Sequence, residues 1–375
     1  MHIWRDPAGS IPAHQWFARS NATCGSVSVK VALDAQLGVG TATGIGEYVK
    51  GLAGALRLRG VDLSELRAPS LDPWRFDRRV LWDQILLPRR ARRSGAALLH
   101  CAAGTMPRFA AMPIVVTVHD LAWHAVQGHT PAYARYYFGR FALDRYRAAA
   151  RVIVDSYYTR GELLRLAPQL EPGRIDVVYP GVSSDFRNLV RAPTGARTIL
   201  AVGTIEPRKN LEVLIAALAQ LPDARLIAIG PATPYAQQCA QLAKRFKVAD
   251  RVELRGYVAR EELLMLYREC AVAAVPSRYE GFGYAAAQAL CAGIPCVVSN
   301  CTSLPEVVGD AASIVPADDA PAWAAALARA LQGGDDVRAA GARAASVARF
   351  SWDRCAAEVE RVYALVDGRG SLEDR

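Results

Sequence analysis

The sequence contains no apolar run that approaches the roughly 20 residues needed to cross a bilayer. Residues 1–26 also lack the basic segment followed by an apolar core that marks a signal peptide, so we interpret them as a flexible N-terminal extension. With 52% hydrophobic and 22% charged residues, the chain has the composition of a globular protein, and 375 residues are enough for two domains. We therefore predict a cytoplasmic protein with two domains.

Cysteines with the spacing of a metal or redox site are missing as well. None of the eight cysteines belongs to a Cys-x-x-Cys pair, and Cys296 and Cys301 have no histidine near them in the chain. Most of the cysteines lie in apolar segments, which is typical of buried thiols in a cytosolic protein. We therefore expect reduced thiols and no zinc site.

A dinucleotide fingerprint is also absent. The glycines between Gly38 and Gly46 do not follow Gly-x-Gly-x-x-Gly, and no acidic residue stands suitably at the end of a second strand. This absence disfavours a dehydrogenase. The segment is still typical of a strand, a glycine loop and a helix, because residues 28–34 are largely apolar and residues 47–59 have helical period.

The chain has an excess of positive charge, with a net charge of +9 and a pI near 9.2. Such a balance fits anionic substrates, membrane surfaces or nucleic acid. The densest cluster, Arg89-Arg90-Ala91-Arg92-Arg93, follows the apolar residues 85–87. It is either a solvated helix face or a patch that faces anionic lipid headgroups. No recognition motif accompanies the charge, so we expect no nucleic-acid partner.

Strand patterns alternate with helical patterns along most of the chain, which predicts an α/β fold with parallel sheets. The irregular segment 183–193 separates two such series. We predict a first Rossmann-like domain at 27–187, a second at 188–350, and a last helix at 351–366 that begins after Ser351. The predicted strands are residues 28–34, 96–101, 114–119, 151–155, 176–179, 198–203, 224–230, 251–254, 271–275 and 295–299. The predicted helices are residues 47–59, 131–147, 159–166, 211–221, 234–246, 261–270, 320–331 and 337–348.

One stretch, Pro276–Gln288, joins a buried strand to an alanine-rich helix through a glycine loop that carries a carboxylate. Gly281 and Gly283 allow the backbone to approach a ligand, and the helix dipole favours an anion in front of the loop. Glu280 and Gln288 lie about two helical turns apart, so both can face one bound molecule. Taken alone, the stretch also fits an ordinary glycine turn between a strand and a helix.

Two cationic residues follow the first predicted strand of the second series, at the same edge of the sheet as the glycine loop. Arg208 and Lys209 follow Gly203 and precede a predicted helix. Positive side chains beside a helix N-terminus suit a diphosphate, although by themselves they also fit an ordinary surface pair.

His119 stands at the end of the β-branched strand 114–118. Ligands bind at this edge of open parallel sheets, so His119 is a better candidate for function than most single histidines, which are more often structural.

These features occur together with further motifs, and in this order the sequence resembles the GT4 (group 1) nucleotide-sugar glycosyltransferases. The resemblance covers the chain from about Val27 to Val366. The matching motifs are His119-Asp120, Asp155-Ser156, Tyr179-Pro180-Gly181, Gly203 with Arg208-Lys209-Asn210, Glu280-x7-Gln288, Ala292-Gly293-Ile294-Pro295 and Ser303-Leu304-Pro305-Glu306.

The resemblance implies a GT-B fold, in which two Rossmann-like domains face each other across a cleft and the last helix crosses back to the first domain. It also implies retaining transfer of a sugar from a nucleoside diphosphate to a hydroxyl, with no metal or other cofactor. The chain has no Asp-x-Asp motif, and Arg208 with Lys209 can neutralise the diphosphate instead.

The family's roles carry over to matching positions. Glu280 and His119 are the predicted catalytic residues: Glu280 contacts the sugar hydroxyls, and the side chain or carbonyl of His119 stabilises positive charge at the anomeric carbon. Arg208 and Lys209 bind the diphosphate. The other predicted donor contacts are Gly44, Gly46, Gly203, Gly281, Phe282, Gly283, Tyr284 and Gln288.

Gln288 is a departure from the family, which usually has Glu at this position to accept hydrogen bonds from the ribose. An amide keeps one acceptor and adds donors. The difference concerns donor affinity rather than the chemistry.

Within the family the sequence looks most like bacterial mannosyltransferases of surface polysaccharide synthesis. That resemblance implies GDP-mannose as the donor substrate and a lipid-linked oligosaccharide as the acceptor. It also gives the cluster Arg89–Arg93 a role in peripheral contact with the inner face of the cytoplasmic membrane. Two alternatives stay open: a transferase that uses a UDP-sugar, and a catalytically silent protein that binds nucleotide sugars or glycans. An epimerase or phosphorylase is disfavoured.

Overall fold

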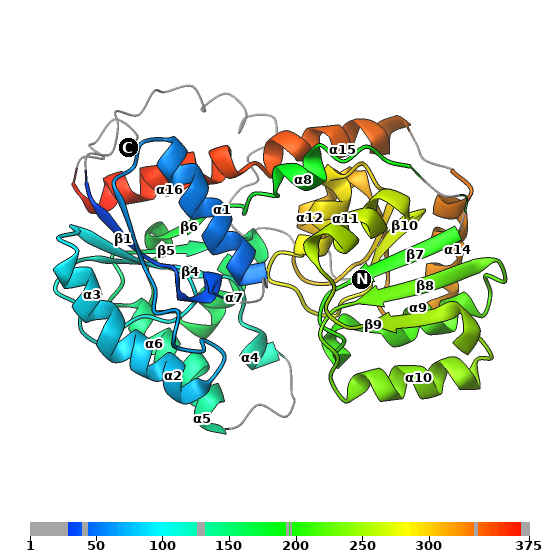
Figure 1. Ribbon diagram of the computed structural model, residues 1–375, viewed down its shortest axis with the longest axis horizontal. Helices are drawn as coiled ribbons and strands as arrows, with labels where there is room; N and C mark the ends of the chain where they lie inside the picture. Colours follow the sequence, from blue (N-terminus) through cyan, green and yellow to red (C-terminus); the bar gives the residue numbers. More distant parts are fainter. Residues whose placement is uncertain are drawn as a thin grey trace.

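The computed structural model describes residues 29–39, 44–125, 132–192, 195, 197–333 and 337–368. The predicted N-terminal extension, residues 1–26, lies outside these ranges. The described chain forms two parallel six-stranded sheets, one made by each half of the sequence (Figure 1).

The first sheet has the strand order β2-β1-β3-β4-β5-β6, and all of its strands run parallel. Its strands are β1 (Val31–Asp34), β2 (Leu63–Leu66), β3 (Leu98–Cys101), β4 (Ile114–Val118), β5 (Arg151–Val154) and β6 (Ile175–Val177). The α-helices of this half are α1 (Gly44–Leu58), α2 (Phe76–Leu81), α3 (Leu87–Arg93), α4 (Ala122–Ala125), α5 (Ala132–Arg135), α6 (Ala142–Tyr146), α7 (Tyr157–Leu166) and α8 (Ser184–Arg187).

The second sheet has the order β12-β11-β10-β7-β8-β9, and it is also parallel. Its strands are β7 (Arg197–Val202), β8 (Ala224–Ile229), β9 (Val252–Arg255), β10 (Val272–Val275), β11 (Cys296–Ser299) and β12 (Ser313–Val315). Its α-helices are α9 (Leu211–Leu218), α10 (Tyr235–Arg245), α11 (Arg260–Glu269), α12 (Tyr284–Cys291), α13 (Leu304–Val308), α14 (Ala320–Leu331) and α15 (Val337–Arg349), and α16 (Trp352–Val366) ends the described chain.

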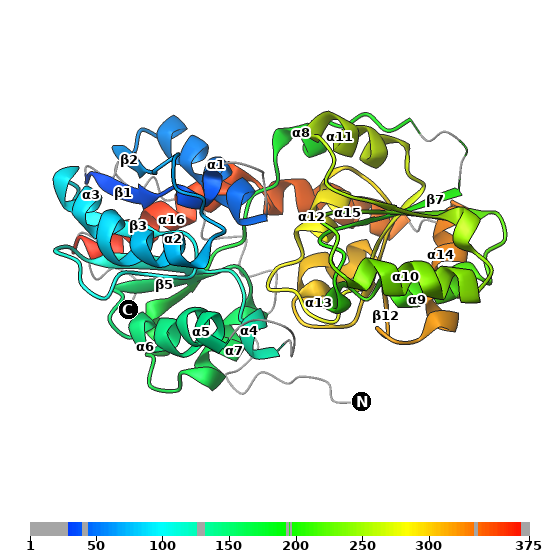
Figure 2. The ribbon, with the colours of Figure 1, turned by 60° about the horizontal axis from the view of Figure 1, so that its bottom comes forward.

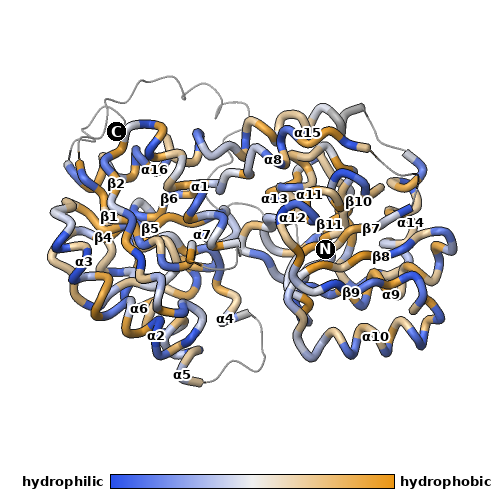
Figure 3. The backbone as a smooth tube through the Cα atoms, in the orientation of Figure 1, coloured by the Kyte–Doolittle hydropathy of each residue, from blue (hydrophilic) through white to orange (hydrophobic). Residues whose placement is uncertain are grey.

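Helices cover both faces of each sheet, which explains why the central strands are apolar throughout. All residues of β4 and β10 are buried. The most hydrophobic stretches of the backbone lie on the strands (Figure 3). Figure 2 shows the second sheet with α8 and α11 on one face and α9, α10 and α14 on the other.

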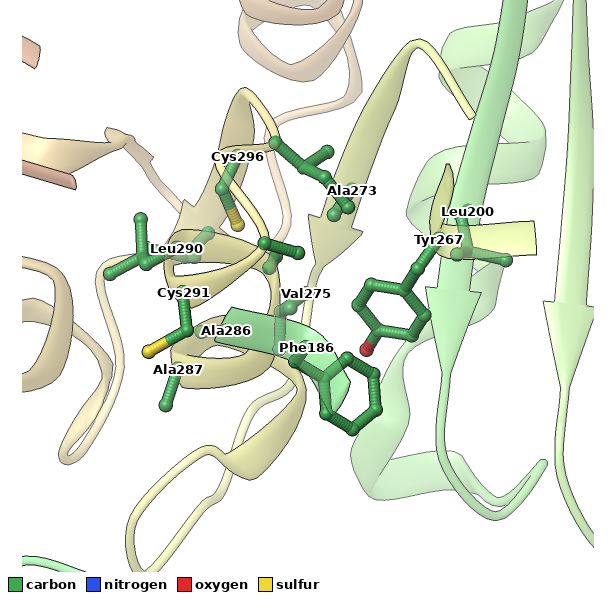
Figure 4. Close-up of a cluster of buried hydrophobic side chains, with 14 of the residues drawn as sticks. Phe186, Leu200, Tyr267, Ala273, Val275, Ala286, Ala287, Leu290, Cys291 and Cys296 are labelled. Carbon is green, nitrogen blue, oxygen red and sulfur yellow. The ribbon is translucent and has the colours of Figure 1, made fainter. Parts of the chain in front are cut away.

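The helix after β10 packs through its small residues onto its own sheet (Figure 4). Ala286 and Leu290 of α12 share one cluster with Val275 of β10 and with the rings of Phe186 and Tyr267, whose centroids are 5.0 Å apart. Cys291 and Cys296 lie in the same cluster. The seven described cysteines are unpaired, and all except Cys301 are buried, which fits their place in apolar segments.

The last helix returns to the first half of the chain. Apolar residues of α16 and α1 share a buried cluster on one face of the first sheet. Ser351 caps α16, since its hydroxyl oxygen accepts a hydrogen bond of 3.2 Å from the amide of Arg354. The rings of Trp352 lie against Gly51 and Gly181, where an added Cβ would stand 2.1 Å and 2.5 Å from the indole.

The predicted fold class is confirmed: two Rossmann-like parallel sheets are present, and the final helix crosses back. The division at residues 187 and 188 stays a prediction; the first sheet ends at Val177 and the second begins at Arg197. Two short strands at sheet edges, β2 and β12, were not predicted. Within the described ranges, no helix combines the length and the apolar character that crossing a membrane requires.

Candidate functional site

The glycine loop lies at the carboxyl end of β10, as predicted, and leads directly into α12. Gly283 is the residue before the helix and has a φ of 95°, which favours glycine. Gly281 is needed for a different reason. A Cβ at this position would stand 1.9 Å from the carbonyl oxygen of His119, which belongs to the first half of the chain. The loop and the end of β4 are therefore in direct contact.

Glu280 is buried and ionically paired with both predicted diphosphate ligands. Its Oε1 lies 2.6 Å from Nζ of Lys209, and its Oε2 lies 3.2 Å from Nη1 of Arg208. The hydroxyl of Ser277 donates a third hydrogen bond of 2.7 Å to Oε1. Three of the residues predicted from the sequence are thus brought together at one edge of the second sheet.

Neighbouring charges determine the protonation states of Glu280 and Arg208. Burial raises the pKa of Glu280. The charges of Lys209 and Arg208 and the hydrogen bonds lower it by more, so the pKa lies below the usual range. Burial lowers the pKa of Arg208, whereas Glu280 and Glu206 raise it more strongly. Glu280 and Arg208 are therefore both charged at neutral pH.

Local backbone geometry places the two cations. They lie on a 3₁₀ turn, Pro207–Lys209, that follows β7. Asn210, at the start of α9, has a φ of 53°, and its side-chain amide donates hydrogen bonds to the carbonyls of Pro276 and Ala317. Gly203 lies beside Lys209: a Cβ there would be 3.0 Å from Cε of the lysine. A small cavity between the ends of β7 and β10 is lined in part by Gly203, Lys209 and Ser277.

His119 is held by both of its ring nitrogens. Nδ1 lies 2.7 Å from a carboxylate oxygen of Asp155, and Nε2 lies 2.9 Å from the carbonyl oxygen of Ala102. Both partners are acceptors, so a ring with hydrogen on both nitrogens satisfies both contacts. Burial lowers the pKa of His119, but Asp155 and the two hydrogen bonds raise it more, and the net shift is upward. The shift favours the imidazolium form, and the backbone carbonyl is the group that meets Gly281.

Several more contacts join the two halves around this point. The hydroxyl of Tyr279 accepts a hydrogen bond of 3.0 Å from the amide of Leu121. The hydroxyls of Ser156 and Thr159 donate to the carbonyl oxygen of Gly281, at 2.6 Å and 3.1 Å. Glu280 and His119 therefore stand on two sides of one interface.

The remaining predicted donor residues lie near this interface, but their side chains have other partners. The ring of Phe282 packs on the ring of Tyr179 and on that of Phe350, and the hydroxyl of Tyr284 donates to the carbonyl oxygen of Gly181. The ring of Phe282 is therefore part of the packed interior, whereas the Tyr284 hydroxyl can still accept a hydrogen bond. Gln288 accepts a hydrogen bond of 3.2 Å from the hydroxyl of Tyr267.

The two glycines predicted from the first half begin α1. Gly44 is its first residue, with no atom within 4 Å of an added Cβ, and Gly46 is buried. Next to them, Glu47 forms an ion pair of 3.0 Å with Arg260 of the second half. The start of α1 thus reaches the same interface.

Residues that the sequence analysis did not name as site residues support those that it did. Asp155 orients His119, Ser277 binds Glu280, and the hydroxyl of Thr302 accepts a hydrogen bond of 3.0 Å from the amide of Glu280. Asp155 is the last residue of a predicted strand, as His119 is, and this position was the available signal. Within the described part of the chain, no group of three or more His, Cys, Asp or Glu side chains is placed to hold a metal ion.

Family comparisons cover most of the chain. Residues 42–186 match the family described as Glycosyltransferase Family 4, and residues 183–347 match the family described as Glycosyl transferases group 1. The two matched regions meet between β6 and β7.

Two curated relatives share about a third of their aligned residues with this chain. O-antigen chain mannosyltransferase B of Escherichia coli is 31% identical over 270 residues, which cover 67% of this chain and 70% of that protein. D-inositol 3-phosphate glycosyltransferase of Mycolicibacterium gilvum is 34% identical over 284 residues, which cover 69% of this chain and 61% of that protein. The chain thus spans less than two thirds of the second relative.

Solved structures show the same fold at lower identity. Sucrose-phosphate synthase from Thermosynechococcus elongatus superimposes with a TM-score of 0.71 at 23% identity, covering 91% of this chain and 99% of that one. Anabaena HepE in complex with UDP and glucose gives a TM-score of 0.67 at 17% identity, covering 90% and 99%. With both family matches and a relative aligned over most of its length, this chain belongs to the group 1 glycosyltransferases.

Proposed function

We propose that the protein is a retaining mannosyltransferase that moves mannose from GDP-mannose to a hydroxyl of a lipid-linked oligosaccharide. The observation that carries this proposal is the cluster of Glu280 with Lys209 and Arg208, which stands across one interface from the carbonyl of His119. The choice of mannose rests on the similarity to an O-antigen chain mannosyltransferase.

In the proposed reaction the diphosphate of the donor binds at Arg208 and Lys209, whose two positive charges offset the charge of the leaving group. The bond between the anomeric carbon and the diphosphate oxygen breaks, and the electron pair leaves with the diphosphate. The acceptor hydroxyl attacks the same face of the sugar, and its proton passes to the departing phosphate oxygen. The carbonyl oxygen of His119 stabilises the positive charge at the anomeric carbon, and Glu280 holds the sugar hydroxyls. The step needs no metal ion.

The two contacts of the His119 ring sharpen this proposal. Since Asp155 and the carbonyl of Ala102 occupy both ring nitrogens, the ring orients the backbone rather than accepting a proton from the substrate. We therefore assign the contact with the anomeric carbon to the carbonyl.

A thermal-shift screen against UDP-, GDP-, ADP- and CMP-sugars tests the donor. A ligand at about 100 times its dissociation constant should stabilise the protein by about 2.7 kcal/mol. A shift with UDP-sugars and none with GDP or GDP-mannose would make the donor a UDP-sugar. The Glu280→Ala variant should lose transfer and keep nucleotide binding; loss of both would remove the assigned role of Glu280. Turnover with any nucleotide sugar eliminates a catalytically silent protein.

Peripheral membrane contact is the least direct part of the proposal. On α3, the side chains of Arg89, Arg92 and Arg93 are exposed, whereas the guanidinium of Arg90 lies over Trp82, 5.5 Å from the ring centroid. Three positive charges on one short helix suit an anionic headgroup surface.

Sedimentation with vesicles that contain phosphatidylglycerol tests this contact. Replacement of Arg89, Arg90, Arg92 and Arg93 with serine should weaken binding. Vesicles of pure phosphatidylcholine should bind neither the wild type nor this variant. The control replaces Lys244, Arg245 and Lys247, which are exposed on and just after α10, with serine. Equal binding by the α3 variant and the wild type would rule the contact out.

A further inference from the structure

The segment Thr302–Glu306 connects both predicted catalytic residues, although it contains neither of them. At its start, the Thr302 hydroxyl accepts a hydrogen bond from the amide of Glu280, and the Ser303 hydroxyl donates one of 3.0 Å to the carbonyl of Glu280. Thr302 has a φ of 54°, a backbone conformation that residues other than glycine rarely adopt. Its hydroxyl is therefore presented by an unusual backbone turn. This end of the segment therefore fixes the backbone of Glu280.

The other end of the segment reaches the first half of the chain. Oε1 of Glu306 accepts hydrogen bonds of 2.8 Å from the amide of Tyr157 and 2.9 Å from the hydroxyl of Tyr179, and Oε2 accepts one of 3.0 Å from the amide of Tyr158. Tyr157 and Tyr158 are the first two residues of α7. The first amides of a helix have no partner within it, and a carboxylate there also meets the positive end of the helix dipole.

The helix that Glu306 caps begins next to His119. Asp155, which holds the His119 ring, is followed by Ser156, the N-cap of α7. The hydroxyls of Ser156 and Thr159 in turn bind the carbonyl of Gly281, one residue beyond Glu280. A closed chain of contacts thus runs from Glu280 through Glu306 and α7 to Asp155 and His119, and back to Gly281.

We propose that Glu306 is a positioning residue, whose carboxylate caps α7 from the opposite half and thereby holds Glu280 and His119 at the distance that transfer needs. This role deepens the proposed function and rests on it. The contact is polar, so water can replace it when the halves separate. An apolar contact would hold the halves together but would cost more to open.

The identity of the side chain matters for this role. In a Glu306→Gln variant, the amide oxygen can still accept from Tyr157 and Tyr179, but its NH₂ group would face the amide of Tyr158, donor to donor. In a Glu306→Ala variant, both α7 amides lose their partner. The loss of function should therefore increase from Gln to Ala.

Hydrogen–deuterium exchange on the full chain tests the contact directly. The Glu306→Ala protein should take up deuterium faster in the first turn of α7 and in residues 279–283, both without ligand and with GDP or UDP at saturation. With a donor that supports turnover, kcat should fall roughly 10- to 100-fold, while the dissociation constant of the nucleotide should stay within about twofold, because Glu306 contacts neither Arg208 nor Lys209. Glu306→Gln should lie between Ala and the wild type.

Glu162→Gln is the matched control, since Glu162 lies on α7 and pairs with Arg165 of the same helix rather than with the other half. It should leave exchange and kcat unchanged. A folded Glu306→Ala protein with wild-type exchange at α7 would overturn the proposal, and so would faster exchange with unchanged kcat. The exchange measurement does not depend on donor identity, so a failed donor assignment leaves this test decisive.

Discussion

Each of the two sheets carries an ionic cluster at the carboxyl ends of its strands, yet the clusters differ in composition and exposure. In the first half, Arg79 lies 3.0 Å from Asp83 and 3.5 Å from Asp34 at the end of β1, and none of these side chains is more than 4% exposed. In the second half, Glu280 lies between Lys209 and Arg208, and the two cations are 15% and 22% exposed.

The difference shows why only one of these edges suits an anion. Two carboxylates share one cation in the first cluster, so no positive charge is left for a ligand. In the second cluster Lys209 and Arg208 share Glu280, and Arg208 also pairs with Glu206 at 2.7 Å, but both cations reach the solvent. The pKa values follow the same contrast: burial dominates and raises the pKa of Asp34, whereas the neighbouring cations outweigh burial and lower the pKa of Glu280. The carboxyl edge of the first sheet thus carries a fully buried cluster, whereas that of the second carries a partly exposed one.

The largest expected effect comes from breaking the first cluster. Arg79→Met should lower the free energy of unfolding by about 3–5 kcal/mol, because two buried carboxylates lose their cation. Urea unfolding followed by circular dichroism measures this change. Arg75→Met is the control, since Arg75 is exposed and pairs with exposed Asp77. A loss no greater than that of the control would contradict the structural role of the first cluster.

The second cluster should respond in the opposite way. Lys209→Met should reduce kcat roughly 100-fold, or about 2.7 kcal/mol, whereas the free energy of unfolding should fall by only about 1–2 kcal/mol, because Glu280 keeps Arg208 and Ser277. Steady-state kinetics and urea unfolding of the same preparation separate the two effects, and Lys244→Met on α10 serves as the control. If Lys209→Met costs as much stability as Arg79→Met and leaves kcat unchanged, the contrast between the clusters fails.

A smaller effect is expected from Gly281→Ala, which acts on the interface between the halves. The added Cβ would stand 1.9 Å from the His119 carbonyl oxygen and 2.6 Å from Cβ of Asp120, so the contact should weaken by about 1–3 kcal/mol. The expected result is a kcat at least about tenfold lower, with little change in nucleotide binding.

Gly161→Ala is the control for this substitution, since Gly161 lies within α7 and nothing stands within 4 Å of its Cβ position. It should stabilise the protein by up to about 1 kcal/mol without affecting kcat. Equal kinetics for the two alanine variants would contradict the close contact at Gly281.

The smallest expected effects are two opposite pH dependences of stability. The lowered pKa of Glu280 contributes stability above the ordinary carboxyl pKa of about 4.3, and this contribution is lost as the pH falls through the lower folded value. The stability difference between wild type and Glu280→Gln should therefore shrink below about pH 5. Asp34 has a raised pKa, so the difference between wild type and Asp34→Asn should instead decrease as the pH rises above about 3.9. Urea unfolding between pH 3 and pH 7 measures both, and slopes of the same sign would contradict the contrast.

Much of the fold could be predicted because the central strands are buried on both faces. Continuous apolar segments such as Ile114–Val118 and Val272–Val275 are too short for a buried helix and are typical of a buried strand. Two of the four edge strands were missed, since Leu63–Leu66 and Ser313–Val315 are short and only partly buried. The expected helix over residues 131–147 is also interrupted by a π-helical stretch, Tyr136–Phe141, which shifts the aromatic stripe.

The candidate site could be predicted in part, where local patterns reveal it. Glu280, Arg208, Lys209 and His119 all follow predicted strands, and the carboxyl edge of a parallel sheet brings such positions together. The contacts of Glu306 could not be found this way, because its partners Tyr157 and Tyr158 lie almost 150 residues earlier and belong to the other sheet. Such pairings depend on how the halves meet, which periodicity does not encode.

The return of α16 to the first half has a mechanical consequence. The chain crosses between the halves twice, once after β6 and once before α16, and the two crossings are joined by a hydrogen bond of 2.8 Å from the amide of Val182 to the carbonyl of Phe350. Two linked crossings constrain the relative motion of the halves more than a single connection would. Any separation of the halves at the interface around Glu280 therefore has to bend both crossings together.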